Sequence, residues 1–107
     1  MVELLNPIGD MVLGFSGSSE TIYVSAFYTW RLANGTVPPA PMLFRKGEDY
    51  FNDTRWGDYS CTSLDPVDEA TFWTVQEYAR PRAPAPPEPE PVIPQWGTWV
   101  GNVIPSP

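Results

Sequence analysis

Proline and glycine divide this sequence into short pieces more strongly than any other feature does. The 107 residues include 14 prolines and 8 glycines. Because proline fixes φ and lacks an N–H donor, a long uninterrupted helix has little room between these positions. Aromatic residues, which favour strands, make up 14% of the chain. We therefore predict an all-β fold of short antiparallel strands joined by turns.

Segments in which apolar and polar side chains alternate predict the strands. The clearest are residues 21–30 and 71–79. Phe72 and Trp73 would point to opposite faces, so both are packed only where the sheet has neighbours on each side. The remaining strands are predicted within residues 10–16, 42–53 (two short strands around a turn), 59–64 and 96–103.

Prolines are densest just before the last predicted strand. Seven of the sixteen residues from 80 to 95 are proline. This composition predicts that residues 81–95 form a loop or an extended spacer, followed by a final strand and a frayed terminus in residues 96–107. Recognition of the same tract by an SH3-type or WW-type domain is the alternative.

Charge and residue types exclude several classes of function. Thirteen acids against six bases give a net charge of −7, and the bases form no large cluster in the sequence, so nucleic acid binding is not expected. One cysteine and no histidine exclude an internal disulfide, the usual zinc sites and Ser-His or Cys-His catalysis. Cys61 is expected to be a small buried residue within a strand. We assign no catalytic residue and expect no reaction from this chain alone.

Membrane insertion is also not expected from the sequence. No stretch reaches the roughly 18 apolar residues that a membrane-spanning helix needs. Near the start of the chain, Glu3 stands where a signal peptide would carry positive charge, so no signal peptide is expected.

The segment RWGDYS gathers residue types that either a turn or a binding site could use. In the first interpretation, Gly57 takes an unusual backbone conformation, Asp58 accepts from a turn amide, and Arg55 lies over Trp56 or Tyr59. In the second, a sugar or an acidic ligand is bound by Arg55, Trp56, Asp58 and Tyr59.

Residues 65–68, Asp-Pro-Val-Asp, predict a type I turn. Pro66 presets φ at the second position, and the Asp65 carboxylate can accept from backbone amides two or three residues further on. The turn would join a strand ending at Leu64 to one beginning near Thr71, which makes a hairpin.

Two longer stretches point to a known family. RWGDYSCTSLDPVDEATFWTVQEYA followed by WGTWVG, with GDMVLGFSGSSETIYVSAFYTWRL upstream, resembles the C-terminal segment of bacterial sialidase-like β-propeller proteins of the BNR or Asp-box type. The resemblance covers residues 9–80 and 96–103. It implies about two propeller-type blades in residues 1–80, a C-terminal fragment of a larger secreted protein, and an extracellular or cell-surface location.

The hairpin turn is similar to an Asp box, although it lacks the turn glycine and has two extra residues between its serine and its threonine. The residues that correspond are Ser63, Asp65, Asp68, Thr71, Phe72 and Trp73. In that family the box lies on the outer rim, away from the active site, so the similarity implies a structural role.

The resemblance implies a scaffold or a binding surface, with carbohydrate as a candidate ligand and with further blades or other copies of the chain as partners. Two alternatives remain: a piece of a sialidase-like glycoside hydrolase with its catalytic residues elsewhere, and a small independent β-domain that displays a proline-rich peptide. No cofactor is expected. Calcium is an alternative, since carboxylate oxygens are available from Asp53, Asp58, Asp65, Asp68 and Glu69.

Overall fold

The computed structural model describes residues 2–35, 40–52, 56, 59–84 and 92–105. In this part of the chain all regular structure is β, which confirms the expected all-β class with antiparallel strands. The seven strands are β1 (Val2–Leu5), β2 (Met11–Gly17), β3 (Ser25–Arg31), β4 (Met42–Arg45), β5 (Cys61–Leu64), β6 (Phe72–Pro84) and β7 (Val92–Val103).

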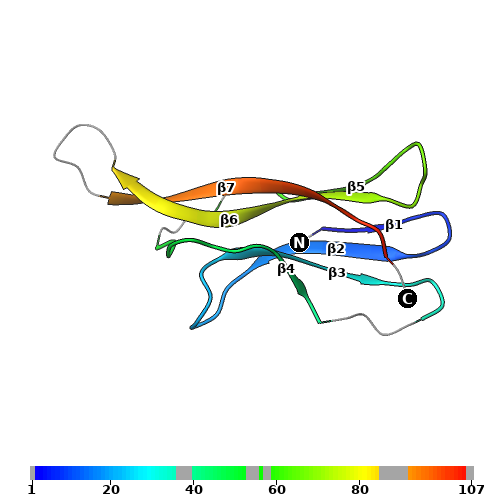
Figure 1. The fold of residues 1–107 in the computed structure, drawn as a ribbon, viewed down its shortest axis with the longest axis horizontal. Helices are drawn as coiled ribbons and strands as arrows, with labels where there is room; N and C mark the ends of the chain where they lie inside the picture. The colour runs from blue at the N-terminus through cyan, green and yellow to red at the C-terminus, as the bar shows by residue number, and fades with distance from the viewer. Residues whose placement is uncertain (1, 36–39, 53–55, 57–58, 85–91, 106–107) are drawn as a thin grey trace.

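The strands form two antiparallel sheets that pack face to face (Figure 1). One sheet has the order β1-β2-β3-β4 and the other has the order β5-β6-β7, so within each sheet the strands pair in the order of the sequence. Neither sheet closes on itself. The contacts between the sheets place β1 and β2 over β5, and β2 and β3 over β6. The result is an elongated molecule of 56 × 30 × 17 Å.

Alternation along β2 and β3 decides which side chains face the other sheet. Val12 and Gly14 are buried, and they pair with Trp30 and Tyr28 on the neighbouring strand. Ala26, at the start of the same face, is fully buried. Because side chains alternate with a period of two, this agrees with the apolar face predicted from the sequence.

The apolar core between the sheets is small. Val12, Phe72 and Val103 form its buried cluster, and four partly buried residues pack against them: Leu4, Tyr28, Trp30 and Leu64. Phe72 is fully buried whereas its neighbour Trp73 is 42% exposed, which confirms that the two rings point to opposite faces of β6.

Polar side chains are buried beside this cluster, on the three-stranded sheet. The Ser60 hydroxyl donates to Gln76 Oε1 at 2.7 Å, and Gln76 Nε2 donates to Thr74 Oγ1 at 2.9 Å. The hydroxyls of Thr62 and Thr74 lie 3.2 Å apart. Facing them is Gly14, where an added Cβ would lie 2.3 Å from Gln76 Nε2. Only glycine leaves room there for this buried hydrogen-bonded chain.

One end of the sandwich is closed by backbone hydrogen bonds between the two layers. The Ala79 N–H donates to Val24 O, and the Glu48 N–H donates to Ala79 O, both at 2.8 Å. The Ser25 hydroxyl accepts from the Gly47 N–H at 2.8 Å. We call this region, residues 23–25, 45–50 and 77–82, the corner.

The strands in the first half of the chain differ from those predicted by the sequence in three ways. β1 is an additional strand, and β3 begins at Ser25 because residues 19–22 turn on themselves through backbone hydrogen bonds. Within residues 42–52 only β4 forms, since the segment after it bonds across the corner to Ala79 instead of pairing with β4.

The strands also extend further into the proline-rich segment than its composition predicts. We expected a loop or spacer over residues 81–95, but β6 continues to Pro84 and β7 begins at Val92. The register shifts between Arg80 and Ala83, which places Pro81 at an irregularity where no ladder N–H is required. The β6–β7 pair thereby forms an arm that reaches beyond the four-stranded sheet (Figure 1).

Candidate binding surface

The segment RWGDYS is only partly within the described residues, because Arg55, Gly57 and Asp58 lie outside them. Trp56 packs edge-on against Phe51, with ring centroids 4.8 Å apart. Tyr59 is exposed, and its ring lies 5.2 Å from that of Trp96 on β7. Trp56 and Tyr59 therefore have different aromatic partners.

The end of this segment is attached to β6. The Tyr59 N–H donates to the carboxylate of Glu77, which is almost completely buried. The next residue, Ser60, donates to Gln76 as described above. These two bonds position the chain for its entry into β5.

The turn that is similar to an Asp box is built on two carboxylates. Asp65 accepts from the Val67 N–H at 2.9 Å, as predicted, and from the indole N–H of Trp73 at 3.2 Å. Asp68 accepts from the Thr71 N–H at 3.0 Å and from the Thr71 hydroxyl at 2.7 Å. These backbone and side-chain hydrogen bonds hold the pKa of Asp68 below its ordinary value.

The remaining residues of this motif lie on the two strands of the hairpin. Ser63 pairs with Trp73, and Leu64 pairs with Phe72. At the turn itself, Glu69 has a positive φ of 52°, a conformation that glycine adopts more readily. All these contacts lie within the hairpin, so they explain its shape without a ligand.

Two further expectations concern Cys61 and calcium. Cys61 is exposed, so the expectation of a buried thiol is wrong; the residue lies on the outer face of β5, a strand at the edge of its sheet. Among the described residues no group of three or more His, Cys, Asp or Glu side chains could hold a metal ion. Asp53 and Asp58 lie outside that part of the chain, and calcium stays a prediction.

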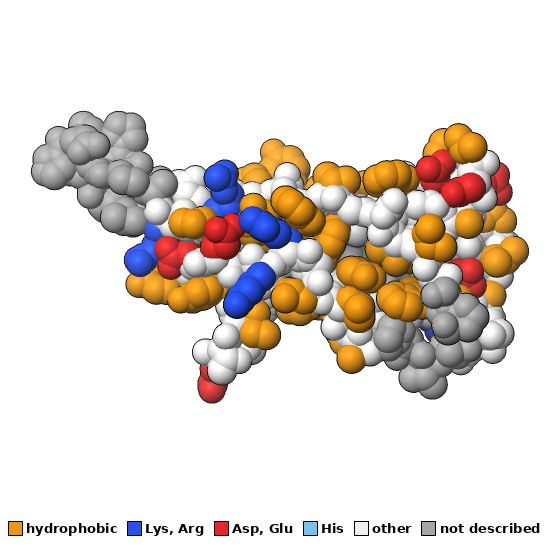
Figure 2. Space-filling model, in the orientation of Figure 1, with side chains coloured by type: hydrophobic (Ala, Val, Ile, Leu, Met, Phe, Trp, Pro, Cys, Tyr) orange, Lys and Arg blue, Asp and Glu red, His pale blue; other side chains and the backbone are white. Residues whose placement is uncertain are grey.

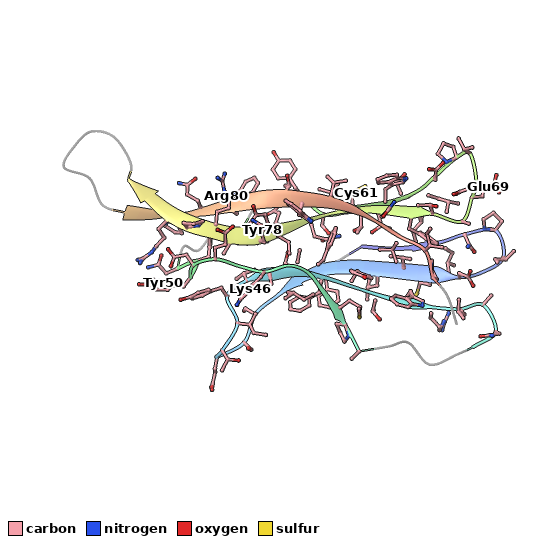
Figure 3. The ribbon with its side chains drawn as sticks, viewed as in Figure 1. Lys46, Tyr50, Cys61, Glu69, Tyr78 and Arg80 are labelled. Carbon is pink, nitrogen blue, oxygen red and sulfur yellow. The ribbon has the colours of Figure 1, made fainter. Side chains whose placement is uncertain are left out.

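Sequence reasoning missed the concentration of basic residues at the corner. Four of the six bases lie within it: Arg45, Lys46, Arg80 and Arg82. Lys and Arg side chains gather on this part of the surface in Figure 2, and Lys46 and Arg80 are labelled in Figure 3. They come from segments more than thirty residues apart in the sequence, so only the pairing of β6 with the corner brings them together. Acidic side chains lie among them, notably Glu48 and Asp49.

Two of these bases are neutralised and stacked on aromatic rings. Arg45 forms an ion pair with Glu48 at 3.0 Å, and its guanidinium lies 4.8 Å from the ring centroid of Tyr78 and 4.6 Å from that of Trp99. Contacts of this kind stabilise a cation on the electron-rich face of a ring. Arg45 thus fastens the end of β4 to β6 and β7.

Arg82 forms the second such arrangement. Its guanidinium lies 4.1 Å from the ring centroid of Tyr50. Asp49 Oδ2 accepts from both the backbone N–H and the Nε–H of Arg82, at 3.0 and 3.1 Å. The backbone hydrogen bond is the main reason why the pKa of Asp49 is lowered, and the same carboxylate raises the pKa of Arg82.

Within the described residues no helix is long and apolar enough to cross a membrane. No protein-family model matches this chain, and neither a curated protein nor a solved structure matches it.

Proposed function

We propose that this chain is a scaffold or binding unit of a larger β assembly of the propeller type, in which its two sheets are neighbouring blades. Each sheet is a simple antiparallel meander, and the two sheets pack face to face. Stacked antiparallel blades have this arrangement.

The observation that carries the proposal is the apolar character of both outer faces. On the four-stranded sheet, the rings of Phe15 and Phe27 stack with centroids 5.6 Å apart, and Leu43, paired with Phe27, is exposed. On the three-stranded sheet, Trp73 and Val100 are exposed. Apolar faces of this kind on small proteins commonly mark surfaces that another protein layer covers.

The proposal predicts that the isolated chain associates with itself. Size-exclusion chromatography with light scattering should detect oligomers, and a urea melt should give a broad transition. Replacing Leu43 or Val100 with lysine should shift the chain toward the monomer, because a charge on the outer face opposes stacking. Val67→Lys is the matched control, since Val67 is 92% exposed on the hairpin turn; it should leave the oligomers unchanged.

A monodisperse monomer with one sharp transition and an m-value of about 1–3 kcal/mol/M would overturn the proposal. That result would favour the second candidate, a small independent β-domain that displays its proline-rich segment. The observation in favour of this candidate is the β6–β7 arm, which carries residues 81–84 and 92–95 of the proline-rich segment beyond the four-stranded sheet (Figure 1).

A further inference from the structure

A pocket that the proposed assembly does not require lies beside the corner. Residues 19–23, from the loop between β2 and β3, form one wall, and Lys46 and Tyr50 form the other. Its volume is about 430 Å³, within the range of roughly 300–1,000 Å³ that is usual for small-molecule sites. A second hollow of about 430 Å³ continues from Tyr23 and Lys46 toward Arg45 and Glu48.

Two tyrosine rings flank this pocket. Tyr23 is 45% exposed and Tyr50 is 48% exposed, and their centroids lie 6.3 Å apart with the ring planes at 48°. Neither ring is needed for the core between the sheets, which is formed by other residues. An exposed tyrosine offers a flat apolar face together with a hydroxyl, and the C–H face of a pyranose ring stacks on such a surface.

Both walls of the pocket are held in place before any ligand arrives. The Ser19 and Ile22 backbones bond to each other, and the Thr21 N–H donates to the Ser19 hydroxyl at 3.2 Å. On the other wall, the contacts of Arg82 and Asp49 described above fix Tyr50, whose own N–H donates to Asp49 Oδ1 at 2.9 Å. Preorganised rings lose little conformational entropy on binding.

The walls also pack tightly against each other at their base. A Cβ at Gly47 would lie 2.3 Å from the carbonyl oxygen of Val24 and 2.9 Å from the carbonyl carbon of Tyr23. Because these are backbone atoms, no side-chain rotation could relieve the contact. Gly47 therefore fixes the distance between the two tyrosine-bearing segments.

Charges at the pocket balance each other. Lys46 is exposed and forms no ion pair with any described residue, whereas Glu20 lies on the opposite wall. Arg45 and Arg82 are already paired with Glu48 and Asp49. A polyanion would thus meet little net positive charge, while a ligand rich in hydroxyl groups could donate to Glu20 and accept from Lys46.

From this geometry we infer that the tyrosine pocket, residues 19–23 with Lys46 and Tyr50, binds a neutral saccharide. A sugar ring stacks on Tyr23 or Tyr50, and its hydroxyls bond to Glu20 and Lys46. The site borders the outer face of the four-stranded sheet, because Ser19 and Ile22 also line a hollow with Phe15 and Phe27. Its two tyrosines lie outside that hollow, and the site does not include the Tyr59–Trp96 contact.

The test is binding of the full chain to arrays of neutral oligosaccharides of glucose, mannose, galactose and N-acetylglucosamine, with oligogalacturonate as the acidic probe. At least one neutral glycan should be retained. Tyr23→Ala and Tyr50→Ala should each weaken its binding by about two- to tenfold, the effect of one aromatic contact. Tyr23→Phe should bind as the native chain does, because the stacking face is kept.

Tyr59→Ala is the matched control, since it removes an exposed tyrosine away from the pocket and should leave binding unchanged. Urea melts of every variant separate a lost site from a lost fold, and light scattering of every variant shows whether its oligomeric state has changed. Absence of binding to every neutral glycan would overturn the inference. So would loss of binding in Tyr59→Ala alone, or binding limited to oligogalacturonate and removed by Lys46→Gln.

Discussion

Aspartate side chains fix several of the loops in this protein. Asp10 accepts from the Ala33 N–H at 2.7 Å and so ties the loop after β3 to the start of β2. Asp49 holds the corner, and Asp65 and Asp68 hold the hairpin turn. In each case a carboxylate accepts from backbone N–H groups that no strand partner satisfies. Four of the thirteen acidic residues therefore stabilise loops and turns.

Asp49 leads to a prediction about acid stability. The pKa of this carboxyl is lowered from its ordinary value of 3.8 by the hydrogen bonds from Arg82. Its stabilisation is therefore fully present above pH 3.8 and is lost as the pH falls through the lower pKa of the folded state. Urea melts across this range should find Asp49→Asn less stable than the native chain at neutral pH. The two should converge in acid, and a gap that does not depend on pH would contradict this account.

The β5–β6 hairpin is the element whose shape depends most on local bonds. Asp65 N donates to Thr71 O at 2.8 Å, and Glu69 N donates to Asp65 O at 3.0 Å, so the loop closes on itself between the strands. The Asp68 carboxylate adds three further bonds, to Ala70 and to Thr71. All of these bonds lie within the turn and involve no residue of the other sheet.

Replacing Asp68 with alanine should lower the urea midpoint, because the Ala70 and Thr71 amides lose their acceptor. Hydrogen exchange should also become faster at these two amides before it changes elsewhere. Glu69→Gln serves as the control, since it removes a charge from the same turn without removing a carboxylate that accepts these bonds. An equal loss of stability in both variants would point to net charge as the cause instead of the hydrogen bonds.

The two layers are joined by a small apolar cluster and by a few hydrogen bonds, among them the one from the Ser16 hydroxyl to Glu77 O at 2.7 Å. The buried cluster of Val12, Phe72 and Val103 lies at one end of the sandwich, and the corner closes the other. Between them lie the hydrogen-bonded side chains of Thr74 and Gln76. Because the buried apolar area is small, each aromatic side chain in the core contributes a large part of the free energy of unfolding.

Phe72→Ala should therefore destabilise the fold by about 3–5 kcal/mol, the usual cost of truncating a buried phenylalanine to alanine. Chemical denaturation at low protein concentration would measure it. Val67→Ala, at an exposed turn position, should change stability by less than about 0.5 kcal/mol. A small effect at Phe72 would mean that the sheets are joined mainly by the polar contacts.

Local patterns in the sequence were enough to predict the class of fold and the hairpin. Alternation predicted the inner face of β3, and the Asp-Pro-Val-Asp segment predicted a turn after Leu64, because both depend on neighbouring residues. The turn was expected to close at Asp68, but the backbone hydrogen bond that closes it is one residue later, from the Glu69 N–H to Asp65 O at 3.0 Å. The sequence also assigned Phe72 and Trp73 to opposite faces. Each of these predictions needs only the period of a strand or the backbone preferences of a turn.

Tertiary structure decided the features that depend on partners far along the chain. Cys61 is exposed because it lies on the outer face of β5, whereas its neighbour Thr62 is buried; the alternation within β5 does not say which of its two faces is covered. Residues 81–84 and 92–95 of the proline-rich segment are part of β6 and β7, because pairing along the rest of these strands offsets the register shift between Arg80 and Ala83. The tyrosine pocket and the basic corner exist only because Ala79 bonds to Val24 and Glu48. Long-range backbone pairing of this kind brings together side chains whose spacing in the sequence carries no periodic signal.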